Sequence, residues 1–431
     1  MASELTTIAD PKAWLRALFD RALGAVRADL VVPPHLPPPP KGRTIVVGAG
    51  KAAAEMAAAV EANWDGPLEG LVVVPYGHAT TTRRIAVAEA GHPVPDIAGV
   101  NAAQTIIHLV SRLTRDDLVL ALISGGGSSL LTLPATGLSL AHKQEVTRRL
   151  LASGAPISAV NTVRKHLSAI KGGRLAAAAY PARVVTLGVS DVPGNDPSLI
   201  ASGPTVPDPT TGADALEIIA HYDIDVRREV HRVLGSPAGI TLGAHDPRLA
   251  ASEFRFVATP RMALEAAAAA AREAAIEPVN LGDEIEGAAR DVAADMAETA
   301  RRAVVGGGPA SPPCVLISGG ETTVSVAGEG HGGRNTEFAL ALALALGGAR
   351  GIHAISCDTD GIDGASGAAG AYVGPDTLSR ARDRGLDAAA HLVDNDSGRF
   401  FETLGDAIVT GPTRTNVNDF RAILIPGRED R

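Results

Sequence analysis

The sequence has few aromatic residues and almost no cysteine. Phe, Trp and Tyr make up 3% of its 431 residues, and Cys314 and Cys357 are too few for a disulfide framework. We therefore expect a reducing compartment, the cytoplasm. No apolar run reaches about 18 residues, the length needed to span a membrane. The opening residues, MASELTTIADPKAW, lack the basic-then-apolar order of a signal peptide.

Basic charge is also in deficit. The chain has 39 Lys and Arg against 48 Asp and Glu, a net charge of −9, so no general basic surface is offered to DNA, RNA or anionic lipid. Hydrophobic residues, in contrast, make up 45% of the chain, which excludes a largely disordered protein. At roughly 150 residues per domain, the length predicts two or three domains with sizeable cores.

Short runs of Val, Leu and Ile alternate with helical stretches from residue 43 onwards. Such runs between helices are typical of a parallel sheet covered on both faces. The pattern predicts strands over 43–48, 70–76, 117–126 and 183–190, and helices over 11–28, 51–62, 100–113, 139–152 and 160–178. The proline-rich segment 31–42 favours polyproline II, and we interpret it as a surface strap.

The alternation pauses at 235–249, which has the composition of a linker, and then restarts. Strands are expected over 254–258, 314–320 and 351–358, a hairpin over 322–333, and helices from Pro260, over 285–304 and from Asn335. The pattern predicts two α/β domains. Residues 1–238 are expected to form a Rossmann-like parallel sheet with helices on both faces, and residues 239–431 a second α/β domain.

Three expected strands run into glycine. Glycine lets the backbone approach closely and adopt positive φ, so that N–H groups can face an anion. Each segment alone is more simply a tight turn, but three of them, with a lysine and several hydroxyls, indicate a phosphate or carboxylate site. The segments are Gly48-Ala49-Gly50-Lys51, Ser124-Gly125-Gly126-Gly127-Ser128-Ser129 and Ser318-Gly319-Gly320-Glu321-Thr322.

The first of these segments fits the dinucleotide pattern G-x-G-x-x-A. That pattern requires an acidic residue at the end of the next strand to hold a ribose, and the strand ends Val74-Pro75-Tyr76-Gly77 instead. The missing acid argues against NAD. Lys51 is the type of cation that stabilises transferring phosphate oxygens. The helix dipole disfavours a lysine at a helix start, which makes a purely structural reason for it less convincing.

Two acidic segments, SDVPGNDP (190–197) and SCDTDGIDG (356–364), follow apolar strands. Asp191 and Asp358 are expected at strand ends, and Asp196, Asp360 and Asp363 in the loops. Carboxylates at that edge of an α/β sheet suit Mg²⁺ shared with substrate phosphates. Turn formation explains some of the five equally well.

Two basic segments complete the set. Arg334, in GHGGRNTE (330–337), could form a bidentate pair with a carboxylate or phosphate, or could be a surface arginine at a capping turn. Arg164, Lys165 and Lys171 share the segment 161–175. For the two lysines a solvated basic face is the preferred interpretation.

Taken together, the motifs resemble the class II glycerate 2-kinases, the family with a C-terminal MOFRL domain. The resemblance spans residues 12–426 and rests on VVGAGKAA, AGHPVPD, ISGGGSSLL, NTVRKHLSAIKGGRLA, SDVPGNDPSLIASGPTVPDPTT, SGGETTV, GHGGRNTEFALALAL, DTDGIDG and TGPTRTNVNDF. It implies transfer of the ATP γ-phosphoryl group to the 2-hydroxyl of D-glycerate, with Mg²⁺, in a cleft between two α/β domains. Small-molecule substrates are then the expected partners, and a homodimer is left open.

The family's cleft lysine and arginine correspond to Lys51 and Arg334, which we expect to be catalytic together with Asp191. Asp191 and Asp360 are expected to bind magnesium. Contacts to substrate or nucleotide are expected from Gly48, Gly50, Ser124, Gly125, Gly126, Gly127, Ser128, Ser129, Arg164, Asn195, Ser318, Gly319, Gly320, Glu321, Thr322, Gly333 and Asn335.

The chain departs from the family pattern at a few positions. The common S-x-G-T-D-G-x-D-G has Asp358 in place of glycine, so Asp358 is not expected to be a shared ligand, and Arg399 and Arg414 stand where Tyr and Gly are usual. The alternative function is an NAD(P)H-dependent hydroxypyruvate reductase, a name that this family has also carried. A non-catalytic anion-binding protein is a third interpretation.

Overall fold

The computed structural model describes residues 8–427, and the chain divides into two compact units. The first unit contains residues 28–258. The second unit combines the chain up to Arg27 with the part that begins at Thr259. Each unit contains its own sheet and its own hydrophobic core.

The units divide at other residues than the predicted boundary between 238 and 239. Strand β6 (Ser252–Ala258) stays in the first unit because it pairs in parallel with β5 (Arg183–Val189). Helix α1 (Pro11–Ala25) belongs to the second unit because it packs on α11 (Pro260–Glu273). Both assignments come from tertiary contacts, which a local sequence pattern does not contain.

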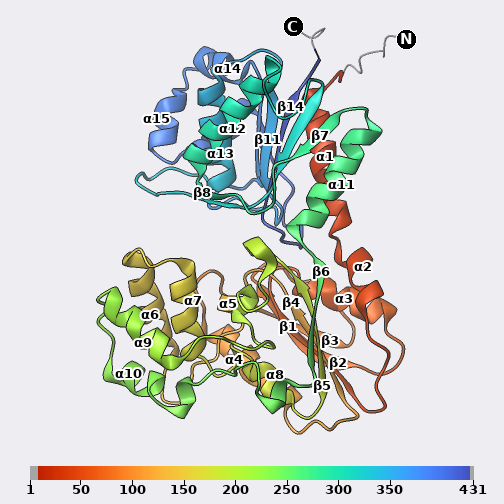
Figure 1. The fold of residues 1–431 in the computed structure, drawn as a ribbon, viewed down its shortest axis with the longest axis vertical. Coiled ribbons are helices and arrows are strands. Elements are labelled where there is room, and N and C mark those ends of the chain that lie inside the picture. The colour runs from red at the N-terminus through yellow and green to blue at the C-terminus, as the bar shows by residue number, and fades with distance from the viewer. Residues whose placement is uncertain (1–7, 428–431) are drawn as a thin grey trace. The chain divides into compact units, whose positions relative to one another are not determined.

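Six parallel strands form the sheet of the first unit, in the order β3-β2-β1-β4-β5-β6 (Figure 1). The strands not yet given are β1 (Thr44–Ala49), β2 (Glu69–Pro75), β3 (Ile85–Ala90) and β4 (Leu118–Ile123). This is the Rossmann strand order, and the direction of winding reverses between β1 and β4. The predicted Rossmann-like fold of this part of the chain is confirmed.

Helices cover this sheet and also form a separate layer of their own. Those that follow the strands are α3 (Ala53–Asn63), α4 (Ile97–Val110), the short α5 (Gly127–Leu130) and α8 (Arg174–Ala179); α2 (Ala28–Val31) precedes β1. The separate layer consists of α6 (Leu140–Ala152), α7 (Ile157–His166), α9 (Gly212–His221) and α10 (Arg228–Leu234) (Figure 1). Its side chains, among them Leu150, Val163 and Ile219, form a second core.

The helix predicted over 160–178 is interrupted in the structure. Helix α7 ends at His166 and α8 begins at Arg174. Between them Gly172 and Gly173 adopt φ of +57° and +80° and donate their N–H groups to the carbonyls of Ser202 and Gly203. The prediction of one helix was wrong because this glycine pair binds a distant turn.

The second unit has a mixed six-stranded sheet in the order β13-β12-β11-β14-β9-β7, in which only β7 and β9 pair in parallel. The strands are β7 (Glu277–Asn280), β9 (Cys314–Ser318), β11 (His353–Asp358), β12 (Gly370–Val373), β13 (Ala407–Ile408) and β14 (Asp419–Ile425). Helices α12 (Ala289–Val304) and α13 (Arg334–Leu346) lie on one face, and α1 and α11 on the other (Figure 1). Helices α14 (Thr377–Asp383), α15 (Ala388–Val393) and α16 (Ser397–Leu404) complete the unit.

The hairpin predicted over 322–333 does not form. Strand β10 (Glu321–Thr323) pairs in parallel with β8 (Glu286–Ala288), which also means that the predicted helix 285–304 begins only at Ala289. The glycine-rich residues that follow lie on the turn 394–396, where the N–H groups of Gly328 and His331 donate to Asn395 and Asp396. Side-chain acceptors replace the cross-strand partners of a hairpin.

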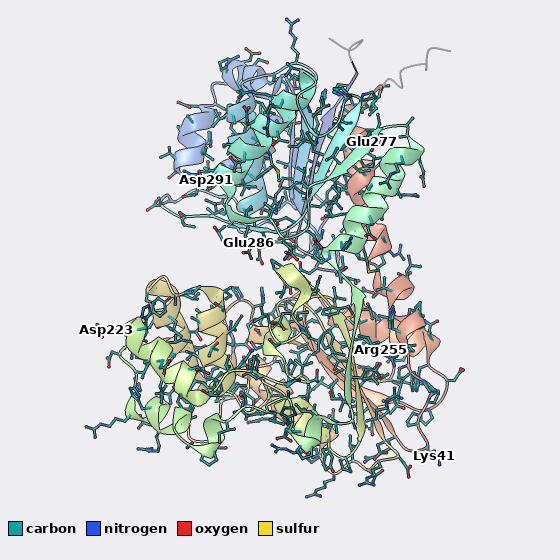
Figure 2. All side chains as sticks on the ribbon, viewed as in Figure 1. Lys41, Asp223, Arg255, Glu277, Glu286 and Asp291 are labelled. Carbon is teal, nitrogen blue, oxygen red and sulfur yellow. The ribbon has the colours of Figure 1, made fainter. Side chains whose placement is uncertain are left out.

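Further features follow from the described residues. Cys314 and Cys357 are free and buried. Within residues 8–427 no helix combines the length and the apolar character needed to cross a membrane. Arg255, labelled in Figure 2, secures the edge strand β6 by donating to the carbonyl of His35 at 2.7 Å.

We predict that Phe19→Ala destabilises the second unit by about 3–5 kcal/mol, the usual cost of emptying a buried aromatic site. Phe19 is fully buried on α1, and its ring lies 5.5 Å from that of Phe420. The chain has two tryptophans, Trp14 on α1 and Trp64 at the end of α3. In a Trp64→Phe background, urea unfolding followed by Trp14 fluorescence reports the change. Val305→Ala, at a side chain that is 79% exposed, is the control, and equal stability of the two variants would contradict the assignment of α1.

Candidate active site

The loops after β1 and β4 interlock at the carboxyl edge of the first sheet. The N–H of Lys51 donates to the carbonyl of Gly125 at 2.8 Å, and the N–H of Ala52 donates to the hydroxyl of Ser124 at 3.0 Å. These strands flank the point where the winding reverses, which is where open α/β sheets bind ligands. The first two glycine segments of the sequence therefore form one structure.

Glycine is required at several positions of this structure. A Cβ at Gly48 would lie 2.2 Å from the carbonyl oxygen of Leu122, and one at Gly50, where φ is +135°, would lie 2.1 Å from the hydroxyl of Ser124. Gly126 adopts φ +80°, and a Cβ there would lie 3.5 Å from Cγ of Lys51. The close backbone approach thus brings the stem of Lys51 beside the second glycine loop.

His92 also lies at this edge, although it is not among the residues predicted for the site. A Cβ at Gly126 would lie 3.0 Å from Nε2 of His92, which places the imidazole against the same loop as Lys51. His92 follows β3, and the motif AGHPVPD that contains it was noted only for its family resemblance. Its position after a strand of the parallel sheet was the available signal.

The next strand along the edge leads to a strained turn. Asp191 is partly buried just beyond β5, and the buried Oδ1 of Asn195 has no hydrogen-bond partner within the described chain. Ala201 and Ser202 then adopt φ of +50° and +63°, values uncommon for residues other than glycine. The Ser202 hydroxyl lies 2.7 Å from that of Ser128, in the loop after β4. The structure thus groups Ser128 with the β5 edge.

The lysines of the segment 161–175 are buried rather than solvated. Lys165 and Lys171 are 3% and 1% exposed, so the preferred interpretation of a solvated basic face was wrong. Lys165 pairs with Asp208 at 3.3 Å, and Lys171 donates to the carbonyl of Ala201 at 3.3 Å. Lys165 lies within α7, whereas Lys171 lies in the break between α7 and α8. Arg164 is partly buried.

In the second unit Arg334 is the first residue of α13 and is held by three carboxylates. Its Nε donates to Asp419 at 2.7 Å, and its two terminal nitrogens donate to Glu321 at 3.0 Å and to Asp358 at 2.9 Å. Burial alone would lower the pKa of Arg334, but the three negative charges outweigh it and raise the pKa well above its usual value. Of the five N–H groups of a guanidinium, two have no partner among the described residues.

Asp358 is one of the residues that depart from the family pattern, and its contacts in the structure explain its role. It ends β11 and accepts from Arg334 and from the N–H of Asp360. Glycine at this position could supply neither carboxylate contact. Asp358 therefore holds Arg334 in this chain.

Asp419 connects two arginines of this unit, Arg334 and Arg421. It is 2% exposed, accepts from Arg334 and from the side chain of Asn335 at 2.7 Å, and forms an ion pair with the fully buried Arg421. Burial would raise its pKa, but the charges of Arg334 and Arg421 lower it. Asp419 stays ionised at neutral pH, and the guanidinium of Arg334 is fixed at the start of α13.

The first turn of α13 is closed by Asp363. This carboxylate accepts the N–H groups of Asn335 at 2.9 Å and Thr336 at 2.8 Å. Burial raises the pKa of Asp363 to about 6, against the lowering effect of these bonds. Gly333 is required because a Cβ there would lie 2.4 Å from Asp363. Of the expected ligand residues, Gly333 and Asn335 thus hold the helix start.

The third glycine segment, residues 318–322, is less open to an anion than its sequence suggests. Ser318 and Thr322 are 1% and 2% exposed. The N–H groups of Gly319 and Glu321 donate to the carbonyls of Gly282 and Ile285, and that of Thr322 donates to Asp419. These amides already have partners, because the segment before α12 runs alongside. Within this set, Glu321 reaches Arg334 with a side chain that is 45% exposed.

The expected magnesium ligands lie in different units. Asp360, in the second unit, is 3% exposed and accepts the N–H of Ile362 at 2.8 Å. Asp191 is in the first unit. Across residues 8–427 no group of three or more His, Cys, Asp or Glu side chains could hold a metal ion by itself.

Comparison with known proteins identifies the chain. The profile described as "Domain of unknown function (DUF4147)" matches residues 14–235, and the MOFRL family profile matches residues 314–419. The D-glycerate 2-kinase of Thermotoga maritima is 39% identical over 410 residues, which covers 95% of this chain and 97% of that protein. The chain belongs to the glycerate 2-kinase family. The family resemblance inferred from the motifs is confirmed.

Two further comparisons bear on the fold and on the names that relatives carry. The crystal structure of glycerate kinase from Thermotoga maritima matches with a TM-score of 0.87 and 37% identity, over 96% of this chain and 99% of that chain. An Agrobacterium vitis protein named "Putative hydroxypyruvate reductase" is 56% identical over 416 residues, which covers 95% of this chain and 94% of that protein. Names of both activities therefore occur among the relatives.

We predict that Asp419→Asn lowers the free energy of unfolding of the second unit by about 3–5 kcal/mol. The change removes negative charge from the fully buried Arg421 and from the partly buried Arg334. Glu321→Gln removes a carboxylate from the same Arg334 but at a half-exposed site, so it should cost less than about 1 kcal/mol. Urea unfolding with Trp14 fluorescence measures both variants. Equal losses would show that Asp419 is not the residue that holds this cluster.

Proposed function

We propose that this chain is an ATP-dependent glycerate 2-kinase, which transfers the γ-phosphoryl group of ATP to the 2-hydroxyl of D-glycerate and releases ADP. One observation carries the proposal. The glycine loops after β1 and β4 interlock around Lys51 at the winding reversal of a parallel sheet, in a chain 39% identical over nearly its whole length to a D-glycerate 2-kinase. A cytoplasmic location, where ATP is available, is part of the proposal.

Phosphoryl transfer asks a protein mainly to position groups and to stabilise charge. The loop after β4 supplies the N–H groups of Gly125 and Gly126 at the sheet edge, whereas those of Gly127 and Ser129 donate to the carbonyls of Ser124 and Gly126. The ammonium of Lys51 supplies a positive charge beside this loop. In the proposed reaction these groups contact phosphate oxygens, which carry most of the negative charge in the transition state. Asp191, after β5, orients the 2-hydroxyl of glycerate and accepts its proton.

Arg334 is assigned to the same reaction from the second unit. Its three carboxylates hold the guanidinium in one orientation, so its two remaining N–H groups are preorganised for an anionic oxygen. The carboxylate of glycerate is the group we assign to them. Three of the five N–H groups of Arg334 already donate to carboxylates of the protein. Fewer donors are therefore available to glycerate than in the unpaired guanidinium that the sequence pattern suggests.

The carboxylates of Asp191 and Asp360 are the type of ligand that holds magnesium in kinases. Mg²⁺ is held in such sites by one or two carboxylates, with its other ligands supplied by phosphates and water. Single aspartates in the loops just after β5 and β11 suit this arrangement. Asp191 and Asp360 are the residues proposed to hold it. Bound magnesium would neutralise charge on the transferring phosphate.

The alternative reductase activity would require an acidic residue at the end of β2 to bind the ribose of NAD(P)H, and none is available there among the described residues. At the end of β2, Tyr76 is 60% exposed, and the neighbouring carboxylates of Glu89 and Asp96 accept the N–H groups of Gly77 and Gly99. Both carboxylates therefore already accept hydrogen bonds from the backbone.

A direct test incubates the protein with glycerate or hydroxypyruvate and measures ADP release and NADH oxidation. We expect ADP release with glycerate, and NADH oxidation with hydroxypyruvate alone would refute the proposal.

We predict that Lys51→Met lowers kcat about 10²–10³-fold, because loss of a preorganised charge costs about 2.7–4 kcal/mol of transition-state stabilisation. The melting temperature should stay near that of the wild type. Lys41→Met, at an exposed lysine of the same unit (Figure 2), is the matched control and should keep full activity. A folded Lys51→Met variant with wild-type kcat would exclude the proposed role of Lys51.

A further inference from the structure

A group of basic side chains in the first unit lies largely out of solvent. Lys143 on α6 is 6% exposed, and Lys171, just before α8, is 1% exposed. Arg164 on α7, which lies between these two lysines in the sequence, is partly buried. We call these three residues the basic cluster. Lys143 donates to the carbonyls of Leu167 at 3.0 Å and Arg164 at 3.4 Å, and Lys171 donates to that of Ala201 at 3.3 Å. All of these acceptors are neutral.

No carboxylate balances the basic cluster among the described residues. The charges that act on Lys171 are those of Arg164 and Lys143, and those that act on Lys143 are Arg164 and Arg174. The buried acid of this region, Asp208, is engaged with Lys165 at 3.3 Å and with the hydroxyl of Thr210 at 2.8 Å. Buried charges in proteins are normally paired or hydrogen-bonded to a counter-ion.

The guanidinium of Arg164 is available to bind a ligand. None of its side-chain nitrogens makes a hydrogen bond or ion pair within residues 8–427, although the side chain is only partly exposed. A guanidinium presents five donors in a planar fork that matches carboxylate and phosphate oxygens. Arg164 is therefore the side chain of the basic cluster that a ligand can reach directly.

The basic cluster adjoins the loop that follows β4. Ala201, whose carbonyl accepts from Lys171, lies so close to this loop that a Cβ at Gly127 would be 2.7 Å from the Cβ of Ala201. The next residue, Ser202, has its hydroxyl 2.7 Å from that of Ser128. The cluster and the proposed phosphate loop are thus joined through the strained turn 201–203.

We propose that Arg164, Lys143 and Lys171 form an anion subsite that binds a carboxylate or phosphate group of a substrate. The subsite deepens the proposed function, because the anion is either the carboxylate of the acceptor or a phosphate of the nucleotide. The entering anion supplies the negative charge that the cluster lacks. Arg164 contacts it directly, and the two lysines provide the positive field behind Arg164.

Protonation accompanies binding in this arrangement. Burial, reinforced by the neighbouring cations, lowers the pKa of Lys143 to about 7 and that of Lys171 well below its usual value. An anion at the cluster favours the charged lysines, so binding at pH 8 takes up protons and weakens as the pH rises. The anion-free protein should also become more stable from pH 7 towards 10, because the unfolded chain keeps its lysines charged over that range and binds more protons.

The test is isothermal titration calorimetry of the full chain with D-glycerate and, separately, with ADP, in Tris and in HEPES at pH 8. Different observed heats in the two buffers measure proton uptake. Lys171→Met and Arg164→Met should weaken binding of one of the two ligands about 10–100-fold, the value of a hydrogen-bonded charge. The control Arg148→Met removes an exposed cation from α6, the helix of Lys143, and should bind both ligands normally.

Stability separates a functional from a structural role. Methionine replaces the buried amine with an apolar chain of similar length, so Lys171→Met should melt at or above the temperature of the wild type while it loses binding. If Lys171→Met does not fold, Arg164→Met at the more exposed position decides the outcome. Folded variants that bind glycerate and ADP as the wild type does would overturn the subsite.

The ligand affected identifies the source of the anion. A loss confined to glycerate assigns the subsite to the carboxylate, and one confined to ADP assigns it to a nucleotide phosphate. If the wild-type protein does not phosphorylate glycerate but Arg164→Met still loses ADP binding, the proposed function fails and the subsite stands.

Discussion

The approach of two backbones at the carboxyl edge of the first sheet is the constraint on which the candidate site depends. Strands β1 and β4 come so close that a single methyl group at Gly48 would lie 2.2 Å from the carbonyl oxygen of Leu122. Only because Gly48 and Gly50 lack side chains can the following loops exchange hydrogen bonds and bring Lys51 beside Gly126. A change of one residue here would separate the loops and displace the charge between them, although no catalytic side chain had been removed.

Arg334 in the second unit and the lysines of the basic cluster in the first unit have opposite electrostatic surroundings. In the second unit Arg334 is surrounded by Asp419, Asp358 and Glu321, so its orientation is fixed before any ligand arrives. In the first unit Lys143 and Lys171 have neutral acceptors only, and burial lowers the pKa of each. The first arrangement preorganises a charge, and the second leaves a charge deficit that an anion can fill. A glycerate kinase must bind both the carboxylate of glycerate and the triphosphate of ATP, and each arrangement could bind one of these anions.

Local pattern predicted much of the fold because strand and helix periods are local properties. The Val- and Leu-rich runs before Gly48 and Ser124 are strands of one parallel sheet, and the glycines after them do lie at its ligand-binding edge. The pattern failed where distant partners decide the structure. Gly172 and Gly173 bind the turn at Ser202 and break a helix, and the amides of Gly319 and Glu321 in the third glycine segment donate to residues before α12. Burial of Lys171 and the contact of His92 with the glycine loop likewise depend on tertiary packing, and no spacing in the sequence encodes them.

The central claim is transfer of a phosphoryl group to the 2-hydroxyl of D-glycerate, and the position of that group in the product tests it most directly. The protein is incubated with ATP, Mg²⁺ and D-glycerate labelled with ¹³C at C2, and the product is examined by ¹³C and ³¹P NMR. The account predicts a two-bond ¹³C–³¹P coupling at the labelled C2, through a C2–O–P linkage, and ADP equal in amount to the product, which is 2-phosphoglycerate. Phosphate on the 3-hydroxyl, or unchanged glycerate in a protein that oxidises NADH with hydroxypyruvate, would contradict it.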